Sequence, residues 1–303
     1  MKKSTIKVIL KHGWRVDRAL HNYIYFVFYQ PYIKVAVFFI DLLEKLTWFT
    51  PLVPAIQALY NRFHAKFISF EDVKKILSLN EDLVADTEKN RRIIPFKYAH
   101  KIIFKDPEHI AVMDCPCKKT IPPYISANCC IAVGRDLSTF WTDHCKKYNA
   151  RKITQSEALE MVKNYRKSGH VTQAFFKVAT GGVTGVICNC RPESCISLKA
   201  SKITKNFATG LVQSVSSGYS VKHQPQSCLQ CGACLENCHS GALTLNQSGL
   251  SYDTESCFGC GLCVDACAER ALALFKDPAK PLPLDVDLVR EEFVSDSLNK
   301  EVI

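Results

Sequence analysis

Two cysteine-rich stretches decide the fold of the C-terminal part of this chain: Cys228-Leu-Gln-Cys231-Gly-Ala-Cys234-Leu-Glu-Asn-Cys238 and Cys257-Phe-Gly-Cys260-Gly-Leu-Cys263-Val-Asp-Ala-Cys267. Each cysteine of the second stretch follows its counterpart in the first by 29 positions. The similarity continues beyond the cysteines, since Ala242-Leu243 has its counterpart in Ala271-Leu272. One supersecondary unit is therefore used twice.

The spacing of these eight cysteines predicts iron–sulfur clusters. Three thiolates separated by two residues let a tight loop surround one cubane, and the fourth lies too far along the chain to close the same cluster. We therefore expect one cluster on Cys228, Cys231, Cys234 and Cys267, and a second on Cys257, Cys260, Cys263 and Cys238. Gly232, Gly259 and Gly261 are expected to let the backbone approach the cofactor and donate N–H groups to it. A pair of zinc sites is the alternative, but zinc usually takes paired Cys-x2-Cys arms.

Residues 222–275 resemble the bacterial-type two-cluster ferredoxin family in these cysteines. The resemblance implies two 4Fe–4S clusters, a pseudo-twofold α+β fold with small antiparallel strands, and one-electron transfer without chemistry on a substrate. The family's usual proline after the fourth cysteine is replaced by His239 and Ala268. This departure concerns the local turn and the cluster potential rather than ligation.

The other eight cysteines lie upstream, within residues 115–195. Their layout, with two Cys-x-Cys pairs that each follow a short apolar run, resembles the cysteine-rich domains that precede ferredoxin domains in redox proteins of anaerobes. The resemblance implies an additional cluster, and Arg191 stands where a further cysteine would be expected. The candidate ligands are Cys115, Cys117, Cys130, Cys188, Cys190 and Cys195. A structural zinc or free buried thiols remain alternatives, and Cys129 and Cys145 are interpreted as spare thiols.

Composition limits the class of protein. Sixteen cysteines in 303 residues, behind an N-terminus without a cleavable signal pattern, indicate metal binding in the cytoplasm rather than disulfides. A hydrophobic fraction of 47% excludes a mainly disordered chain. A mean hydropathy of −0.03 argues against a membrane protein with many spans.

The N-terminal third is basic and aromatic. Residues 1–110 hold 18 Lys and Arg against 11 Asp and Glu, whereas Arg270 is the one Lys or Arg between residues 225 and 275. The apolar zone of residues 23–49 is interrupted by charges, so no span is predicted. Two interpretations stay open for residues 1–60: helices lying peripherally at the cytoplasmic face of a membrane, or a helical hairpin packed on its own domain or on a partner. A nucleic-acid partner is not expected, because no recognisable motif accompanies the charge.

We predict an α+β protein of four segments. A mainly helical, basic region covers 1–68, a mixed cysteine-rich domain covers 69–221, the ferredoxin domain covers 222–276, and a Pro-rich tail, either loose or docked on a partner, covers 277–303. Within the second segment, helices are expected at 69–79, capped by Ser69, at 95–104, and after the capping box of Thr154 and Glu157. A strand is expected at 109–114.

The predicted function is that of an iron–sulfur electron-transfer subunit. It would relay single electrons between a partner redox enzyme, for example one containing flavin, and a membrane or soluble acceptor within an oxidoreductase complex. The alternatives are a redox enzyme component with substrate at an upstream open-site cluster, and a metal-containing redox-sensing module. No acid–base constellation is found, so no catalytic residue is proposed.

Overall fold

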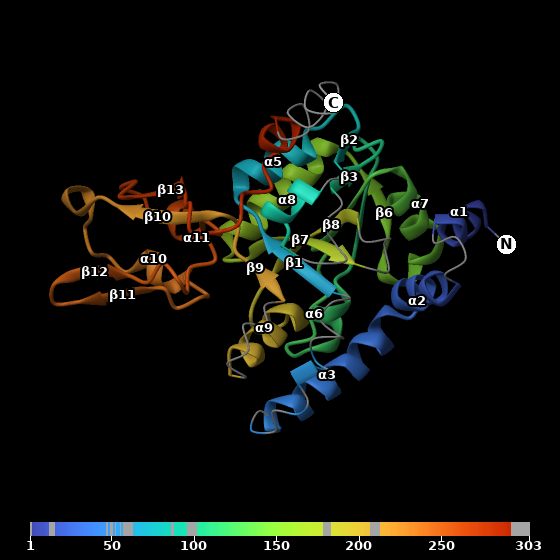
Figure 1. Ribbon diagram of the computed structural model, residues 1–303, viewed down its shortest axis with the longest axis horizontal. Helices are drawn as coiled ribbons and strands as arrows, with labels where there is room; N and C mark the ends of the chain where they lie inside the picture. Colours follow the sequence, from blue (N-terminus) through green and yellow to red (C-terminus); the bar gives the residue numbers. More distant parts are fainter. Residues whose placement is uncertain are drawn as a thin grey trace.

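The computed structural model describes residues 2–11, 16–46, 48, 51, 53, 54, 56, 63–85, 88–95, 102–177, 183–206 and 213–291. These residues form helices and mixed sheets, an α+β architecture in which a large body carries a smaller C-terminal lobe (Figure 1).

A seven-stranded sheet forms the centre of the body, in the order β6-β4-β5-β8-β7-β1-β9. Every neighbouring pair is antiparallel except β1 and β9, which run parallel. The strands are β1 (Phe63–Phe67), β4 (Ile110–Met113), β5 (Cys130–Val133), β6 (Arg151–Ile153), β7 (Val171–Lys177), β8 (Val183–Cys190) and β9 (Ser214–Val215).

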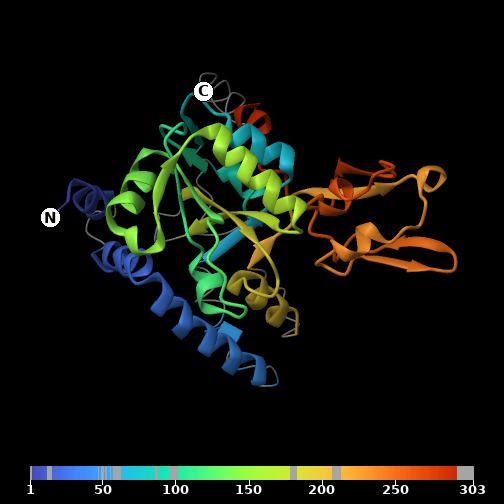
Figure 2. The ribbon, with the colours of Figure 1, turned by 180° about the vertical axis from the view of Figure 1, so that it is seen from behind.

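The two faces of this sheet bury two separate apolar cores. Side chains alternate along a strand, so Ile110 and Val112 of β4 face one core and Ala111 and Met113 face the other. The first core packs against α5 (Phe70–Leu77) and α8 (Gln155–Lys167), which Figure 2 shows in front of the sheet. The second packs against α7 (Arg135–His144) and the N-terminal helices, and it contains the upstream cysteines.

Two of these helices begin where the sequence predicts. Ser69 accepts a hydrogen bond from the amide of Asp72 and caps α5, and Thr154 accepts one from the amide of Glu157 and caps α8. The strand expected at 109–114 is confirmed as β4.

The N-terminal helices α1 (Lys3–Lys11), α2 (Val16–Val27) and α3 (Tyr29–Lys45) lie along the second face. Phe26 is fully buried against Phe140 and Trp141 of α7, so α2 packs on the chain's own body. Pro31 has no N–H to offer Val27 in a continuous helix, which explains why the chain bends between α2 and α3. Among the described residues, no single helix is long and apolar enough to span a membrane. The bent pair Ala19–Val27 and Tyr29–Lys45 reaches that length and apolar composition only when the two helices are taken together.

Shorter elements complete the body. They are β2 (Leu83–Ala85), β3 (Ile102–Phe104), α6 (Pro116–Thr120), α9 (Ile196–Asn206) and the 3-10 turns η2 (Glu88–Arg92) and η3 (Lys146–Tyr148). The helix predicted at 95–104 is wrong at its end, because residues 102–104 pair with β2 as a strand. Residues 96–101 of that prediction lie outside the described residues.

The C-terminal lobe projects from one end of the sheet (Figures 1 and 2). Its elements are β10 (Tyr219–His223), the 3-10 turn η5 (Pro225–Ser227), α10 (Ala233–Glu236), β11 (Leu243–Asn246), β12 (Gly249–Tyr252), α11 (Leu262–Asp265) and β13 (Leu272–Lys276). β10 pairs with β13, and β11 pairs with β12, both antiparallel. The 29-residue repeat reappears here, because α10 and α11 begin 29 positions apart, as do β11 and β13.

Two predicted segment boundaries differ from the structure. The predicted boundary between residues 68 and 69 is wrong, because β1 ends at Phe67 and belongs to the central sheet, where it pairs with β7. The prediction of a loose or partner-docked tail is wrong for residues 282–291. Leu284, Val286 and Val289 are buried in the first core, and Lys75 of α5 pairs with Asp285 at 2.7 Å. Residues 292–303 lie outside the described residues.

Candidate metal centres

The first set of four predicted thiols lines one cavity of about 290 Å³ near the free end of the lobe: Cys228, Cys231, Cys234 and Cys267. Cys231 is exposed and the other three are half-buried. The amide of Ala271 donates to Cys267 Sγ at 3.2 Å, an N–H···S contact of the kind that stabilises a thiolate ligand. The structure therefore brings Cys267 to the same cavity as Cys228, Cys231 and Cys234 of the other repeat.

The second set lines a separate, smaller cavity: Cys238, Cys257, Cys260 and Cys263. Cys257 and Cys263 are buried, so this set is more enclosed than the first. Burial raises the pKa of Cys260 to about 11, and it also raises the pKa of Cys263. The amide of Gly259 donates to Cys257 Sγ at 3.2 Å.

The three predicted glycines adopt left-handed backbone angles that disfavour other residues, with φ between +67° and +81°. They do not all have the same surroundings. A Cβ on Gly232 would meet no atom within 4 Å, whereas one on Gly259 would lie 2.2 Å from Ser217 Oγ. Gly259 therefore also allows the lobe to pack closely on the body.

The second thiol set lies at the junction between lobe and body. Phe258 stacks on Phe67 of β1, with ring centroids 4.2 Å apart. Arg166 of α8 donates through Nε and Nη2 to Asp265 Oδ2, both at 2.7 Å, and through Nη2 to the carbonyl of Cys260 at 2.8 Å. Arg166 is only 3% exposed at its side chain, so this pairing is sheltered on one side from water.

The ring of His239 contacts the carbonyl of Gly169 in the body. This histidine next to Cys238 therefore joins the lobe to the loop after α8.

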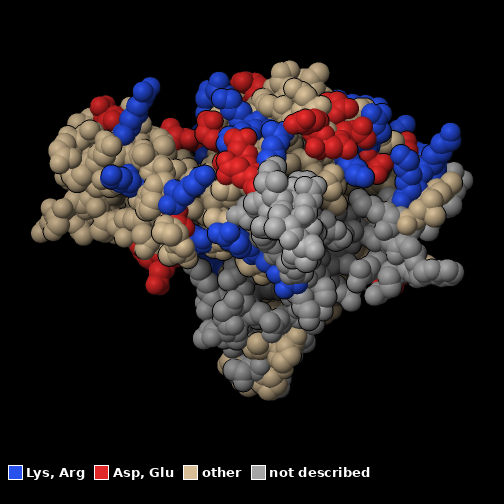
Figure 3. Space-filling view, turned by 45° about the horizontal axis from the view of Figure 1, so that its top comes forward, with Lys and Arg blue, Asp and Glu red and all other residues tan. Residues whose placement is uncertain are grey.

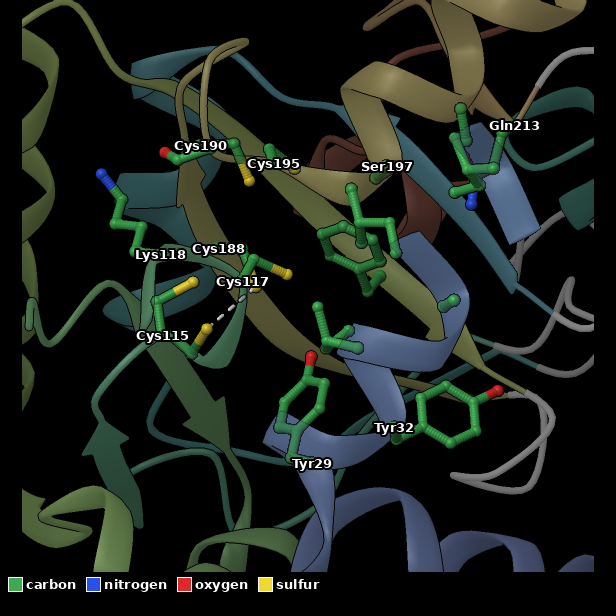
Figure 4. A pocket seen from close by; sticks show the side chains of 18 of the residues that line it. Tyr29, Tyr32, Cys115, Cys117, Lys118, Cys188, Cys190, Cys195, Ser197 and Gln213 are labelled. Atoms are coloured by element: carbon green, nitrogen blue, oxygen red, sulfur yellow. Dashed lines mark hydrogen bonds between the residues drawn. The ribbon is translucent and has the colours of Figure 1, made fainter. Parts of the chain in front are cut away.

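The six upstream candidates line a third cavity of about 300 Å³ in the body: Cys115, Cys117, Cys130, Cys188, Cys190 and Cys195 (Figure 4). All six are buried. They come from the end of β4, the start of α6, the facing positions of β5 and β8, and the turn before α9. The strand register places Cys130 opposite Cys188, and their sulfurs are 3.6 Å apart.

The upstream thiols shift one another's pKa values. Contacts from the thiols of Cys117, Cys129 and Cys130 hold the pKa of Cys115 well below its usual value. The same contacts together with burial raise the pKa of Cys117 and Cys130. These buried sulfurs form a soft donor set suited to iron–sulfur clusters or zinc.

A buried cation lies beside this set. Lys118 lines the cavity, and its Nζ is 2.6 Å from Nε2 of His170. Burial lowers the pKa of His170 to about 4, so the ring is neutral and its Nε2 accepts a hydrogen bond from Lys118 Nζ. The positive charge of Lys118 offsets negative charge on the thiol set.

The remaining two cysteines do not line the cavity. The thiol of Cys129 donates to the carbonyl of Ala127, and the thiol of Cys145 donates to the carbonyl of Phe26. Their interpretation as spare thiols stays a prediction.

The sequence did not predict four residues at these sites: Lys118, Tyr25, Tyr29 and Arg166. Lys118 and the hydroxyl pair of Tyr25 and Tyr29, 2.6 Å apart, line the upstream cavity. The position of Lys118 directly after Cys117 was a usable signal, whereas nothing local indicated that Arg166 would reach the lobe.

The donor sets are made of thiols. In the part of the chain that the structure describes, no three Cys, His, Asp or Glu side chains converge closely enough to hold one metal ion. Each thiol set instead lines a cavity. The residues present therefore fit iron–sulfur clusters, which exchange one electron at a time with redox partners.

Comparison with protein families matches residues 227–271 to the 4Fe–4S dicluster domain. No curated protein matches the chain. The lobe is thus a ferredoxin-like 4Fe–4S domain, and its role is iron–sulfur electron transfer.

Proposed function

We propose that this protein relays single electrons through three 4Fe–4S clusters. An outer cluster is held by Cys228, Cys231, Cys234 and Cys267, and an inner cluster by Cys238, Cys257, Cys260 and Cys263. A third is held by ligands drawn from the six upstream cysteines. The observation that carries the proposal is the grouping of all fourteen thiols around three cavities.

The internal repeat supports a pseudo-twofold lobe with crossed ligation. Left-handed backbone angles recur at Gln230 and Gly259, 29 positions apart, and again at Gly241 and Arg270. Equivalent backbone bends at equivalent positions favour two equivalent cluster loops. Each loop then completes its cluster with the fourth cysteine of the other repeat.

Packing supports an electron path that runs from the outer cluster through the inner cluster to the third. Phe258, Cys260 and Leu262, beside the inner set, belong to the same apolar core as the upstream thiols. Apolar side chains therefore connect the two sites.

The outer set is the natural contact for a redox partner, such as a flavin-containing enzyme. Cys231 is exposed, and the neighbouring Leu229 is 71% exposed. On the face shown in Figure 3, the lobe is largely uncharged, whereas charged side chains crowd the body. An exposed apolar tip at a cluster lets a partner approach it closely.

A peripheral position at the cytoplasmic face of a membrane is part of the proposal. Along α3, Val35, Phe38, Phe39 and Leu42 are between 42% and 65% exposed, while Ile33 packs inward. An exposed apolar stripe beside a basic N-terminus is typical of interfacial helices.

The ligand assignment is tested by metal and EPR analysis of the anaerobically purified full chain. We expect about 12 iron atoms, four for each cluster. The crossed ligation predicts that Cys267→Ala loses the same EPR signal as Cys228→Ala, although Cys267 is closer in sequence to the other triplet. Cys145→Ala is the matched control and keeps all three signals.

Two outcomes would overturn the assignment. If Cys267→Ala instead removed the signal lost in Cys257→Ala, the crossing would be wrong. A wild-type content of about 8 iron atoms with stoichiometric zinc would overturn the third cluster. For the membrane contact, co-sedimentation with vesicles containing anionic lipid should be lost in Phe38→Glu, and unchanged binding in that variant would reject it.

A further inference from the structure

The 29-residue repeat makes Cys257 of the inner set the counterpart of Cys228 of the outer set, yet the two cysteines have different neighbours. The carbonyl of Cys257 accepts a hydrogen bond from Lys280 Nζ at 2.9 Å. No Lys or Arg side chain in the described part of the chain donates to the carbonyl of Cys228, and residues 225–275 contain no lysine at all. A cation therefore stands at only one of two equivalent positions.

A turn after β13 holds Lys280 in this place. Its amide donates to the carbonyl of Asp277 at 3.0 Å, and its Nζ also donates to the carbonyl of Tyr219 at 3.3 Å. The carboxylate of Asp277 accepts from Ser220 Oγ at 2.6 Å. Among the residues that the structure describes, no acidic side chain forms an ion pair with Lys280. The ammonium group therefore brings a positive charge that no carboxylate in contact with it cancels.

Arg166 adds a second cation to the inner site but little net charge. Its Nη2 donates to the carbonyl of Cys260 at 2.8 Å, while the same guanidinium pairs with Asp265 at 2.7 Å. The charges of Arg166 and Asp265 largely cancel at the distance of a cluster. Lys280 is therefore the main source of net positive charge beside the inner set.

The repeat also differs in charge two positions after the fourth cysteine. Ser240 follows Cys238 of the inner set, and its Oγ lies 3.5 Å from Cys238 Sγ, where a hydroxyl can donate to a thiolate. The equivalent residue after Cys267 of the outer set is Glu269, which lines the outer cavity. A hydroxyl donor at one site and a carboxylate at the other add to the asymmetry that Lys280 creates.

This asymmetry bears on how easily each site is reduced. Reduction adds one negative charge, so a neighbouring cation favours it and a neighbouring carboxylate opposes it. Burial of Cys257 and Cys263 opposes reduction of the inner site, but Cys238 and Cys260 are only half-buried, so this effect is partial. A unit charge about 10 Å away, at an effective dielectric constant of about 20, changes an equilibrium about tenfold. Lys280 lies within that range, because it bonds to the carbonyl of a ligand residue.

We propose that Lys280 makes the inner cluster the easier of the two lobe clusters to reduce, so that an electron received at the exposed tip passes towards the body. The step is a transfer of one electron: the outer cluster, reduced beforehand by a redox partner, is oxidised as the inner cluster is reduced, and no bond or proton changes. The proposal rests on the two lobe clusters of the function proposed above and is independent of the third.

The test is an anaerobic redox titration of the iron-loaded full chain, followed by EPR. The inner signal is the one lost in Cys257→Ala, and the outer signal is the one lost in Cys228→Ala. In the wild type, the inner signal should appear first as the potential is lowered. Lys280→Met should make the inner cluster about tenfold harder to reduce, a fall of about 59 mV for a one-electron couple, and should leave the outer potential unchanged. Lys280→Arg keeps the charge and should titrate like the wild type.

The matched control is Lys276→Met, which removes the same charge four positions earlier. Lys276 is exposed, and among the described residues it bonds to no cysteine carbonyl. An unchanged inner potential in Lys280→Met, or an equal fall in Lys276→Met, overturns the proposal. Reduction of the outer cluster before the inner one in the wild type also overturns it, and this measurement decides even if Lys280→Met fails to hold iron. About 8 iron atoms instead of about 12, with the lobe potentials as expected, overturns the three-cluster relay and supports the role of Lys280.

Discussion

The contact between Arg166 and the lobe offers a sharp test of how the lobe is held against the body. Replacing Arg166 by Met keeps much of the side-chain volume but removes both bonds to Asp265 and the bond to the carbonyl of Cys260. The two partners differ in burial, since the side chain of Asp265 is 40% exposed and that of Arg166 only 3%. This difference makes the two single substitutions unequal.

The magnitudes follow from that burial. In Arg166→Met, Asp265 can be solvated, so the ion pair itself contributes no more than about 1 kcal/mol. The stranded carbonyl of Cys260 adds about 1–2 kcal/mol, giving a total loss of about 1–3 kcal/mol. In Asp265→Ala, the buried guanidinium loses its counter-ion, which costs about 3–4 kcal/mol. Asp265→Ala should therefore destabilise more than Arg166→Met.

The assay is anaerobic urea unfolding of the iron-loaded chain. Circular dichroism reports on the fold, and visible absorbance reports on the clusters. Lys167→Met is the matched control, because Lys167 is the exposed neighbour on the same helix and should change stability by less than about 0.5 kcal/mol. If Arg166→Met unfolds at the same urea concentration as Lys167→Met, or if Asp265→Ala is the milder variant, the reasoning is refuted.

Three further predictions concern the junction and the upstream site. Gly259→Ala should lower the free energy of unfolding by about 3 kcal/mol, because the alanine would be strained and its Cβ would clash with Ser217, and Gly232→Ala should lower it by only about 1 kcal/mol. Equal urea midpoints for the two variants would contradict the role given to Gly259. Phe258→Ala should lose about 2–3 kcal/mol of stability, and Phe258→Leu about half of that, in thermal unfolding; a wild-type melting temperature for the alanine variant would reject the contribution of the stack. His170 has a folded-state pKa of about 4, below its unfolded value of about 6.5, so the unfolded chain gains the proton first as the pH falls. Stability should drop by about 2 kcal/mol from pH 6.5 to 5 in wild type relative to His170→Gln, and parallel pH profiles of the urea midpoints would disprove this.

Local patterns in the sequence predict the local structure well. The caps at Ser69 and Thr154 depend on bonds to amides three residues away, so the sequence spacing contains the whole signal. The grouping of Cys267 with Cys228 follows from a repeat that the sequence displays directly, and the structure places them at one cavity.

Nonlocal pairing explains what the sequence did not reveal. β1 belongs to the central sheet because Phe67 pairs with Gln173, more than a hundred residues later. The five-residue strand has no hydrophobic periodicity from which this pairing could be predicted. Leu284 and Val289 follow a run of prolines, so the composition predicted a loose tail although both side chains are buried. The reach of Arg166 depends on how α8 docks against the lobe, and only the assembled structure displays it.

The return of residues 282–291 to the body has a consequence for biosynthesis. Leu284, Val286 and Val289 complete the core on one face of the sheet, and they are made after every residue of the lobe. Ribosomal synthesis therefore delivers all eight lobe cysteines before the body can finish folding. The order of synthesis gives the cell an interval in which iron and sulfide can be delivered to a nascent chain whose last segment has not yet closed the body.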